Sequence, residues 1–271
     1  MSAVIDLHPH VISRDEIRYP RTPLGGKQSD WSQERPVSAP EMIAAMDEAG
    51  IERSVLVQAS TCYGFDNRYV ADSVAEHPSR FSGVFSVDVL AADAPERIGY
   101  WKGKGLIGLR VFVAGHTTQQ DVLLNDPRSF PAWERAQQLN LPVCVQARAQ
   151  ALPQLAAMLE RFRSVKVALD HMARPSLDNS EAHPEPLLEL KKYTNLYLKL
   201  TTHNVHDLPP EFLVRVVKHF GAERVAWGSN YPAAKGKLKD LLQDARKALA
   251  GLAEREREQI FARTAKDFYA L

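Results

Sequence analysis

The sequence predicts a (β/α)8 TIM barrel, and three observations support this fold. Short apolar runs alternate with amphipathic stretches along all 271 residues, which is typical of βα units in a parallel sheet. Eight such units follow one another, the number that closes a barrel. Connections from a helix to the next strand are short, such as "NL" at 140–141, while several connections from a strand to the next helix are long. A doubly wound sheet is the alternative, but no GxGxxG motif follows the first strand.

The expected strands are the β-branched or apolar runs, in chain order Val4–His10, Ser54–Ser60, Gly83–Val89, Ile107–Phe112, Pro142–Arg148, Val165–His171, Leu196–Thr202 and Arg224–Asn230. The expected helices are the amphipathic stretches Ala39–Ala49, Asn67–Glu76, Pro95–Trp101, Pro131–Gln138, Leu152–Phe162, Glu185–Lys192, Pro210–Phe220 and Leu238–Leu249, followed by a closing helix over Glu254–Tyr269. The long connections are Val11–Ser38, Val113–Phe130 and Met172–Pro184. We expect a single barrel domain over residues 1–271, with its active site at the carboxyl ends of the strands.

Composition argues against several classes of function. Lys and Arg total 34 and Asp and Glu total 33, so the net charge is +1, and no basic run suggests nucleic acid. No stretch approaches the ~18 apolar residues of a membrane span, and the first residues lack the charged lead and apolar core of a signal peptide. The two cysteines, Cys62 and Cys144, have no CxxC spacing. We therefore expect a cytoplasmic protein with reduced thiols.

Polar side chains stand at the carboxyl ends of the first, fifth and sixth expected strands. Because side chains alternate along a strand, Asp6, His8 and His10 are expected on one face, toward the lumen. Two histidines at this spacing can bind one cation, although an isolated HxH is more often a pair of ordinary polar residues. The sixth strand ends in His171, and the matching position of the fifth is Gln146.

The same alternation turns further polar residues inward around the barrel. A buried polar group costs free energy unless something pairs with it, so this gathering favours a ligand site. An internal ion pair between Asp88 and Arg110 is an equally good explanation for those two residues. The inward set comprises Gln58, Ser60, Asp88, Arg110, Arg148, Lys199, Thr201 and Asn230.

Four strand ends, "DLHPH", "GLRVF", "LDH" and "WGSNYP", resemble the amidohydrolase-related family, and within it lactonases such as 2-pyrone-4,6-dicarboxylate lactonase. The resemblance implies a (β/α)8 barrel that hydrolyses lactones, esters or amides, or that decarboxylates or hydrates small acids. Metal-using members bind a divalent ion through the HxH pair, a strand-five His, a strand-six His and a strand-eight Asp. Here His8, His10 and His171 match this pattern, whereas Gln146 and Asn230 depart from it.

These departures favour a site without a metal or another cofactor. Zinc prefers imidazole, thiolate or carboxylate ligands, and a neutral amide oxygen is a poor replacement, although three histidines can still hold zinc. In a metal-free site, His8, His10 and His171 are expected to polarise the scissile carbonyl. A histidine would activate the water, since its pKa suits general-base work, and Asn230 would orient that water. Asp88 and His203 are weaker candidates for the base.

Cationic residues gather at the same strand ends and predict the substrate class. Arginine forks bind carboxylates in two-point fashion. Together with the resemblance, this basic pocket predicts a hydrolase of a small carboxylate-bearing lactone or ester, and the resemblance implies aromatic or sugar-acid catabolism. Tyr63, in the loop after the second strand, is expected to line the pocket as a hydrogen-bond donor. The predicted substrate-binding residues are Gln58, Tyr63, Arg110, Gln146, Arg148, Arg174 and Lys199.

Three other functions stay open. The first is a metal-dependent hydrolase or decarboxylase that uses the three histidines. The second is a hydratase or decarboxylase of a small dicarboxylate. The third, which Asn230 keeps open, is a barrel that has lost catalysis and only binds anions.

The long first loop, with Tyr19 and Trp31, is expected to be a lid or else a disordered excursion. The resemblance also favours a homodimer.

Overall fold

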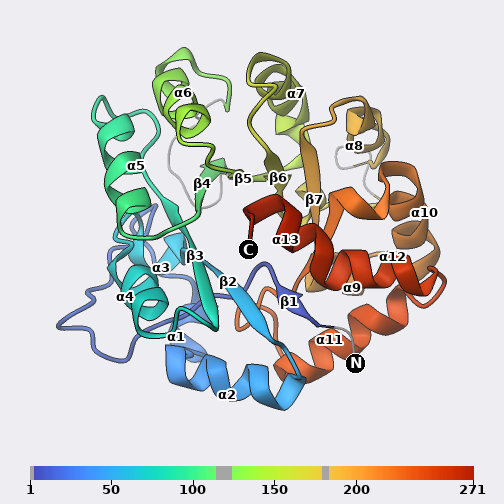
Figure 1. Ribbon diagram of the computed structural model, residues 1–271, viewed down its shortest axis with the longest axis horizontal. Helices are drawn as coiled ribbons and strands as arrows, with labels where there is room; N and C mark the ends of the chain where they lie inside the picture. Colours follow the sequence, from blue (N-terminus) through green and yellow to red (C-terminus); the bar gives the residue numbers. More distant parts are fainter. Residues whose placement is uncertain (1–2, 114–123, 179–182) are drawn as a thin grey trace.

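The computed structural model describes residues 3–113, 124–178 and 183–271. Its centre is an eight-stranded sheet in which each strand pairs in parallel with the next along the chain. The first and last strands complete the ring, because the N–H of Leu7 donates to the carbonyl of Trp227 at 3.2 Å. Helices surround this ring in Figure 1. The predicted (β/α)8 barrel is confirmed.

Each predicted strand is present, although most are shorter than the apolar runs. The polar residues at their carboxyl ends leave the sheet and bend into the loops of one barrel end. The strands are β1 (Ile5–Asp6), β2 (Arg53–Val57), β3 (Phe81–Ser86), β4 (Gly108–Val113), β5 (Val143–Ala147), β6 (Val167–Leu169), β7 (Leu196–Thr201) and β8 (Val225–Gly228).

The predicted helices are also present, with three short helices that the periodicity did not reveal, α1, α3 and α9. The predicted closing helix is divided, because residues 259–263 form a π-helical turn between α12 and α13. The helices are α1 (Asp30–Glu34), α2 (Ala39–Ala49), α3 (Ser60–Tyr63), α4 (Arg68–Glu76), α5 (Ala94–Gly103), α6 (Phe130–Gln138), α7 (Leu152–Arg161), α8 (Glu185–Glu189), α9 (Thr202–Asp207), α10 (Pro210–Phe220), α11 (Leu238–Ala248), α12 (Glu254–Glu258) and α13 (Thr264–Tyr269).

The lumen of the barrel is apolar at one end. Small and branched side chains of the strands, among them Val55, Cys144 and Ala168, pack there against Phe268 and Tyr269 of α13. Figure 1 shows α13 crossing the centre of the ring. Because this end is filled, the polar side chains of the strands can meet a ligand only at the opposite end, where the strands terminate.

Two predicted inward residues lie elsewhere. Val55 faces the lumen and Leu56 the outer core, so Gln58 falls on the outer side, where its amide donates to the carbonyls of Gly64 and Asp66 at 3.2 and 2.8 Å. The apolar run of β2 has no alternation that would reveal its inner face, and the predicted orientation of Gln58 was wrong. Asp88 is exposed beyond the end of β3, and the expected pair with Arg110 is absent from the described residues.

The first long loop, Val11–Ser38, packs over the barrel mouth. Gly64 makes this possible: its φ is +55°, and a Cβ there would lie 2.4 Å from the carbonyl oxygen of Thr22. The hydroxyl of Tyr63 accepts hydrogen bonds from Ser13 N at 2.8 Å and Arg21 Nη1 at 2.5 Å. Tyr63 therefore ties down the loop and does not line the pocket as predicted. Parts of the other two long loops lie outside the described residues.

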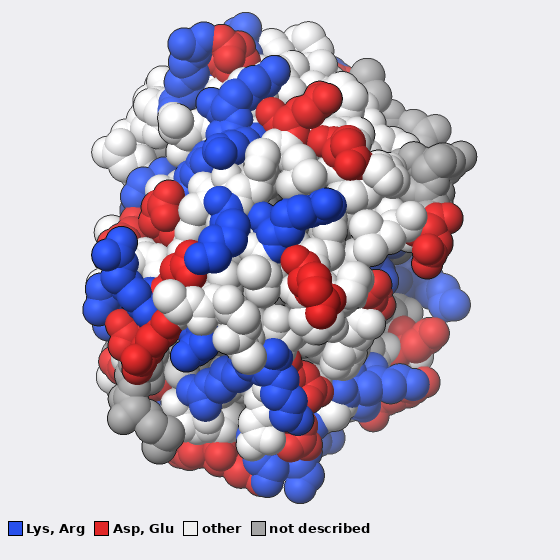
Figure 2. All heavy atoms as spheres, turned by 90° about the vertical axis from the view of Figure 1, so that its right-hand side faces the viewer, with Lys and Arg blue, Asp and Glu red and all other residues white. Residues whose placement is uncertain are grey.

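The surface carries both signs of charge. Figure 2 shows basic and acidic side chains interspersed on the face that lies to the right in Figure 1. Lys218 of α10 and Glu256 of α12 form one exposed pair, at 2.7 Å. Within the described residues, no helix has both the length and the apolar composition needed to cross a bilayer.

Candidate active site

A cavity of about 210 Å³ opens at the carboxyl ends of the strands. Trp31 of α1 lies on its wall, with its ring centre 5.3 Å from that of His10. Of the predicted site residues, His8 and Lys199 lie beneath the cavity, and Gln58 and Tyr63 face away from it. Those that line it are His10, Arg110, Gln146, Arg148, His171, Arg174 and Asn230.

Beneath the cavity, one carboxylate stands between two cations. Asp170 Oδ1 lies 3.0 Å from Lys199 Nζ, and Asp170 Oδ2 accepts from Arg110 Nε at 3.1 Å. His8 lies against this group, with Nδ1 3.6 Å from Asp170 Oδ1 and 3.5 Å from Lys199 Nζ. Gly228 of β8 leaves room for His8, because a Cβ there would lie 2.6 Å from the Cβ of His8. We call Arg110, Asp170 and Lys199 the charged floor.

Burial and mutual attraction set the charges of this floor. Burial raises the pKa of Asp170, but the charges of Lys199 and Arg110, together with the contact from His8, outweigh it and hold that pKa well below its usual range. Burial lowers the pKa of Lys199, and the attraction of Asp170 overcomes it, so the pKa is raised. Burial lowers the pKa of His8 to about 4. Near neutral pH the charged floor holds two cations and one anion, and His8 beside it is a neutral imidazole.

Asp170 is not among the site residues predicted from the sequence, although it stands beside His171 in "LDH". It was overlooked because alternation from a strand-end His171 turns Asp170 outward. In the structure β6 ends at Leu169, and the chain changes direction before His171. Two fully or nearly buried cations, Arg110 and Lys199, were the signal that an inward acid had to exist.

Hydrogen bonds assign the tautomers of two pocket imidazoles. His10 Nδ1 lies 2.7 Å from the carbonyl oxygen of Val57, which can only accept, so Nδ1 carries the proton. Asn204 Oδ1 accepts from the hydroxyl of Thr201, so the Thr201 oxygen accepts from His171 Nδ1 at 2.8 Å. The Nε2 atoms of both rings are therefore acceptors, which does not suit the expected polarisation of a carbonyl. Burial lowers the pKa of both histidines well below the usual value.

A strained turn brings His171 and Arg174 into the cavity. The four residues 171–174 all have left-handed backbone angles, with φ of +57°, +52°, +59° and +54°. None of the four is glycine, and a left-handed backbone conformation costs a non-glycine residue about 1–2 kcal/mol. Asn204 Nδ2 holds the turn by donating to the carbonyl of His171 at 2.8 Å. Strain of this kind gathers at functional sites.

Asn230 makes its side-chain contact with a histidine. Its backbone is left-handed at φ +57°, a conformation that asparagine tolerates better than most residues. Asn230 Nδ2 lies 3.0 Å from Nε2 of His203, on the first turn of α9. An amide nitrogen only donates, so Nε2 accepts and the ring proton lies on Nδ1. His203, a weaker candidate in the sequence, thus lines the cavity, with its ring centre 5.4 Å from that of His171.

The two arginines at the mouth are poorly neutralised. Arg174 Nη2 lies 3.6 Å from Asp207 Oδ2, and both side chains are partly exposed. The carbonyl of Arg148 accepts from the N–H of Ala151, but its guanidinium forms no salt bridge or hydrogen bond with any residue that the structure describes. Burial, and then the charge of Arg174, lower the pKa of Arg148. A guanidinium in this position is suited to binding an anion.

The donor set does not fit a divalent metal. Among residues 3–113, 124–178 and 183–271, no three His, Cys, Asp or Glu side chains are arranged to hold an ion. Asn230 directs its amide nitrogen at His203, and the Lys199 ammonium stands 3.5 Å from His8 Nδ1. Amides are weak ligands for zinc, and a neighbouring ammonium repels a cation.

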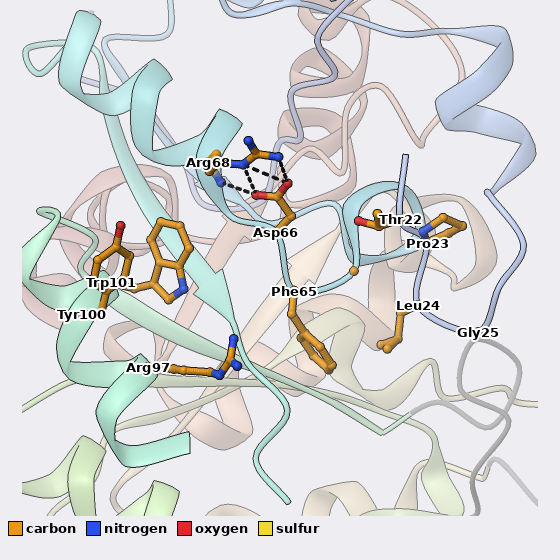
Figure 3. Close-up of a pocket in the computed structure, with 11 residues that line it drawn as sticks. Thr22, Pro23, Leu24, Gly25, Phe65, Asp66, Arg68, Arg97, Tyr100 and Trp101 are labelled. Carbon is orange, nitrogen blue, oxygen red and sulfur yellow. Dashed lines mark hydrogen bonds and ion pairs between the residues drawn. The ribbon is translucent and has the colours of Figure 1, made fainter. Parts of the chain in front are cut away.

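A larger cavity, of about 610 Å³, lies elsewhere, between the first loop, the residues after α3 and helix α5. Figure 3 shows Asp66 and Arg68 facing each other on its wall, with Tyr100 and Trp101 on another side. Asp66 and Arg68 form an ion pair, and Arg97 pairs with Asp93 at 2.7 Å. Each of its charged side chains has an ion-pair partner in the protein, so the smaller cavity is the better candidate for chemistry.

Comparison with known proteins identifies the relatives of the chain. The amidohydrolase family model matches residues 5–271. An L-fucono-1,5-lactonase of Burkholderia ambifaria is 27% identical over 249 residues, which cover 87% of this chain and 82% of the lactonase.

Solved structures share the fold. One is described as a "probable 2-pyrone-4,6-dicarboxylic acid hydrolase" of Acinetobacter baumannii with citric acid bound, with a TM-score of 0.78, 19% identity and 99% of each chain covered. Another is an amidohydrolase of Burkholderia multivorans with bound zinc, with a TM-score of 0.80, 19% identity and 100% of each chain covered. At these identities the likeness concerns the fold.

Proposed function

Since the chain belongs to the amidohydrolase family, we propose that it hydrolyses a small carboxylate-bearing lactone or ester without a metal. One observation carries the proposal: Arg148, unpaired among the described residues, stands at the mouth of a small cavity lined by neutral imidazoles. The likeness to a lactonase supports the reaction type. A lactone of a sugar acid is the first class to test, and pyrone and muconolactone carboxylates are the second.

Substrate binding is assigned to the mouth. Arg148 and Arg174 bind the carboxylate through charge-assisted hydrogen bonds. Gln146 Oε1 is buried without a partner among the described residues, and it accepts a hydrogen bond from a substrate hydroxyl. A cavity of about 210 Å³ limits the substrate to a small molecule.

The chemistry is assigned to the deeper part of the cavity. Arg110, held by Asp170, faces the scissile carbonyl and stabilises the negative charge that develops on its oxygen. The acceptor Nε2 atom of His10 or of His171 accepts a hydrogen bond from one hydrogen of the water that attacks the carbonyl carbon. The carbon–oxygen bond of the lactone ring then breaks, and the product contains one additional water. His8 stays neutral beneath them, and Asn230 orients the water.

The donor set supports the proposed metal independence, which has its own test. The purified enzyme should keep its activity in chelator, and its metal content should be well below one ion per chain. A stoichiometric metal ion whose removal abolishes turnover would instead support the metal-dependent alternative.

A panel of lactones tests the reaction. The enzyme is incubated with sugar-acid lactones, muconolactone-type acids and pyrone dicarboxylates, and in parallel with neutral lactones of equal ring size. The masses of the products are measured by mass spectrometry. We expect carboxylate-bearing lactones to gain the mass of one water, faster than neutral ones. A product that has lost carbon dioxide would overturn hydrolysis in favour of decarboxylation. Tight binding without any turnover would indicate an anion-binding barrel.

A further inference from the structure

We infer that His203 is the general base of this hydrolysis and that Asn230 positions it. The inference rests on the proposed function and adds the residue that takes the proton from water. Asn230 lies just beyond the end of β8, and its amide has no lone pair basic enough to accept a proton. Another group must therefore do so.

The cavity offers few groups that can. Its lining contains no aspartate or glutamate among the described residues. The groups with basic lone pairs near neutral pH are the imidazoles of His10, His171 and His203. The choice of base is therefore a choice among three rings.

Two of these rings are poor bases. His10 and His171 are 4% and 7% exposed, and burial is the largest cause that lowers the pKa of either ring. An imidazolium buried this deeply is unfavourable. His203 lies on the wall of the cavity and is less buried, and Asp207, four residues later on α9, stabilises its charged form. The proton is taken up with the least penalty at His203.

The contact with Asn230 prepares His203 for this role. The amide donates to Nε2 at 3.0 Å and so keeps the lone pair of His203 on the nitrogen that faces Asn230. When a water molecule displaces this direct bond, it donates one hydrogen to Nε2 and accepts from Asn230 Nδ2. Its remaining lone pair is then free for the substrate carbonyl.

The proton balance closes within the pair. The water oxygen bonds to the carbonyl carbon, its proton passes to His203 Nε2, and the carbonyl π electrons move to the oxygen that faces Arg110. Collapse of this oxyanion breaks the carbon–oxygen bond of the ring. The imidazolium of His203 returns its proton to the leaving oxygen, so the enzyme is unchanged and one water has been added.

The charges that face His203 keep it neutral at rest. Burial lowers its pKa, the charges of Arg174, His206 and Arg148 lower it further, and Asp207 raises it. His171 also lies against the ring, and it is neutral. The base is therefore unprotonated near pH 7, and kcat/KM should fall in acid as His203 becomes protonated.

Replacement of His203 tests its role on the best lactone from the panel. We expect His203→Gln to lower kcat roughly 10²–10⁴-fold with little change in KM, and added imidazole to restore part of the activity of His203→Ala. The matched control is His206→Gln on the same helix, where the side chain is half exposed and pairs with Asp244 at 3.8 Å. It should keep the kcat of the unmodified enzyme.

Replacement of Asn230 tests whether its amide acts through His203. Such a role predicts a change in the pH profile of kcat/KM that a purely structural role would not produce. Asn230→Asp places a carboxylate against His203, favours the imidazolium, and should shift the acid limb of kcat/KM to higher pH. An unmoved limb overturns the inference, even if His203→Gln fails to fold. So does a folded His203→Gln enzyme whose kcat is within about threefold of the original. Either result would leave lactone hydrolysis standing, whereas an unmodified enzyme without lactonase activity would remove the proposed function itself.

Discussion

At the floor of the barrel, Asp170 stands between Lys199 and Arg110 at 3.0 and 3.1 Å. At the mouth, Arg148 has no acid partner among the described residues, and Arg174 reaches Asp207 only at 3.6 Å. Both regions are cationic, but in the floor both cations contact one internal carboxylate, whereas at the mouth Arg148 has no such contact among the described residues.

The difference separates two roles of cationic side chains, one in the stability of the fold and one in substrate binding. Buried charges are tolerated when they are paired and hydrogen-bonded, so the floor belongs to the folded structure and presents a fixed field to the cavity. A partly buried and unpaired guanidinium is favourable only when an anion joins it. Replacement in the floor should therefore change stability first, and replacement at the mouth should change substrate binding first.

Removing the carboxylate of the floor should have the largest effect on stability. Asp170→Asn leaves Lys199 and Arg110 as uncompensated buried cations, and we expect the free energy of unfolding to fall by about 3–5 kcal/mol. Urea denaturation measures this loss, with Arg148→Met as the matched control at the mouth. A loss below about 1 kcal/mol would show that the floor is better hydrated than its burial indicates.

The barrel was predictable because its signals are local. Helix α2 begins at Ala39 and ends at Ala49, as predicted, since Ser38 forms a capping box with Glu41 and the apolar spacing continues to the end. The eight strands were equally clear as apolar runs. Their ends were less so, because a strand's last residues are set by pairing with neighbours distant in the sequence.

The site was predictable only in part. The three histidines and the arginines were found because they stand at strand ends, and alternation gave their direction. Gln58 was misplaced because β2 is apolar on both faces, and Asp170 was missed because β6 leaves the sheet before His171. His203 was undervalued because α9, which starts directly after β7, is too short to show a period.

Acid should have the second-largest effect on stability, through the buried histidines. The pKa of His8 is about 4 in the folded protein and 6.5 ordinarily, so between these values the unfolded chain binds a proton that the folded protein does not. The free energy of unfolding therefore falls as pH falls, by roughly 3 kcal/mol for His8 alone. His10 and His171, with pKa values also lowered by burial, act in the same direction.

The carboxyl group of Asp6 has the opposite effect on stability as the pH falls, and its replacement is the control for the effect of the histidines. Burial raises the pKa of Asp6 to about 6 from 3.8, so Asp6 stabilises the folded protein at low pH, and that stability is lost as pH rises through 6. Urea denaturation between about pH 7 and about pH 5 should show a net loss in acid. Asp6→Asn, which keeps the acceptor for the N–H groups of His8 and Ser229, should make the loss steeper. An unchanged slope would contradict the assignment to Asp6.

Replacement of Arg148 at the mouth should weaken substrate binding. Arg148→Met removes the unpaired guanidinium and keeps much of its apolar length, so we expect KM for carboxylate-bearing lactones to rise about 10–100-fold, the equivalent of one charged hydrogen bond. Stability should change by less than about 0.5 kcal/mol. Neutral lactones of the same ring size are the internal control. An equal rise in KM for neutral and charged substrates would remove Arg148 from carboxylate recognition.

The loop over the mouth should show the smallest effect. Tyr63→Phe removes the hydroxyl that accepts from Ser13 N and Arg21 Nη1, and it leaves a buried N–H of Ser13 without that partner. We expect local opening of the loop to become easier by about 1 kcal/mol, which is about fivefold faster proteolysis when opening precedes cleavage. Limited proteolysis within residues 25–27 measures it, with and without a bound lactone product. If the product slows cleavage of both proteins by the same factor, the loop closes over the site. If it slows neither, the loop is a fixed wall of the cavity, and its hydrogen bonds to Tyr63 serve stability alone.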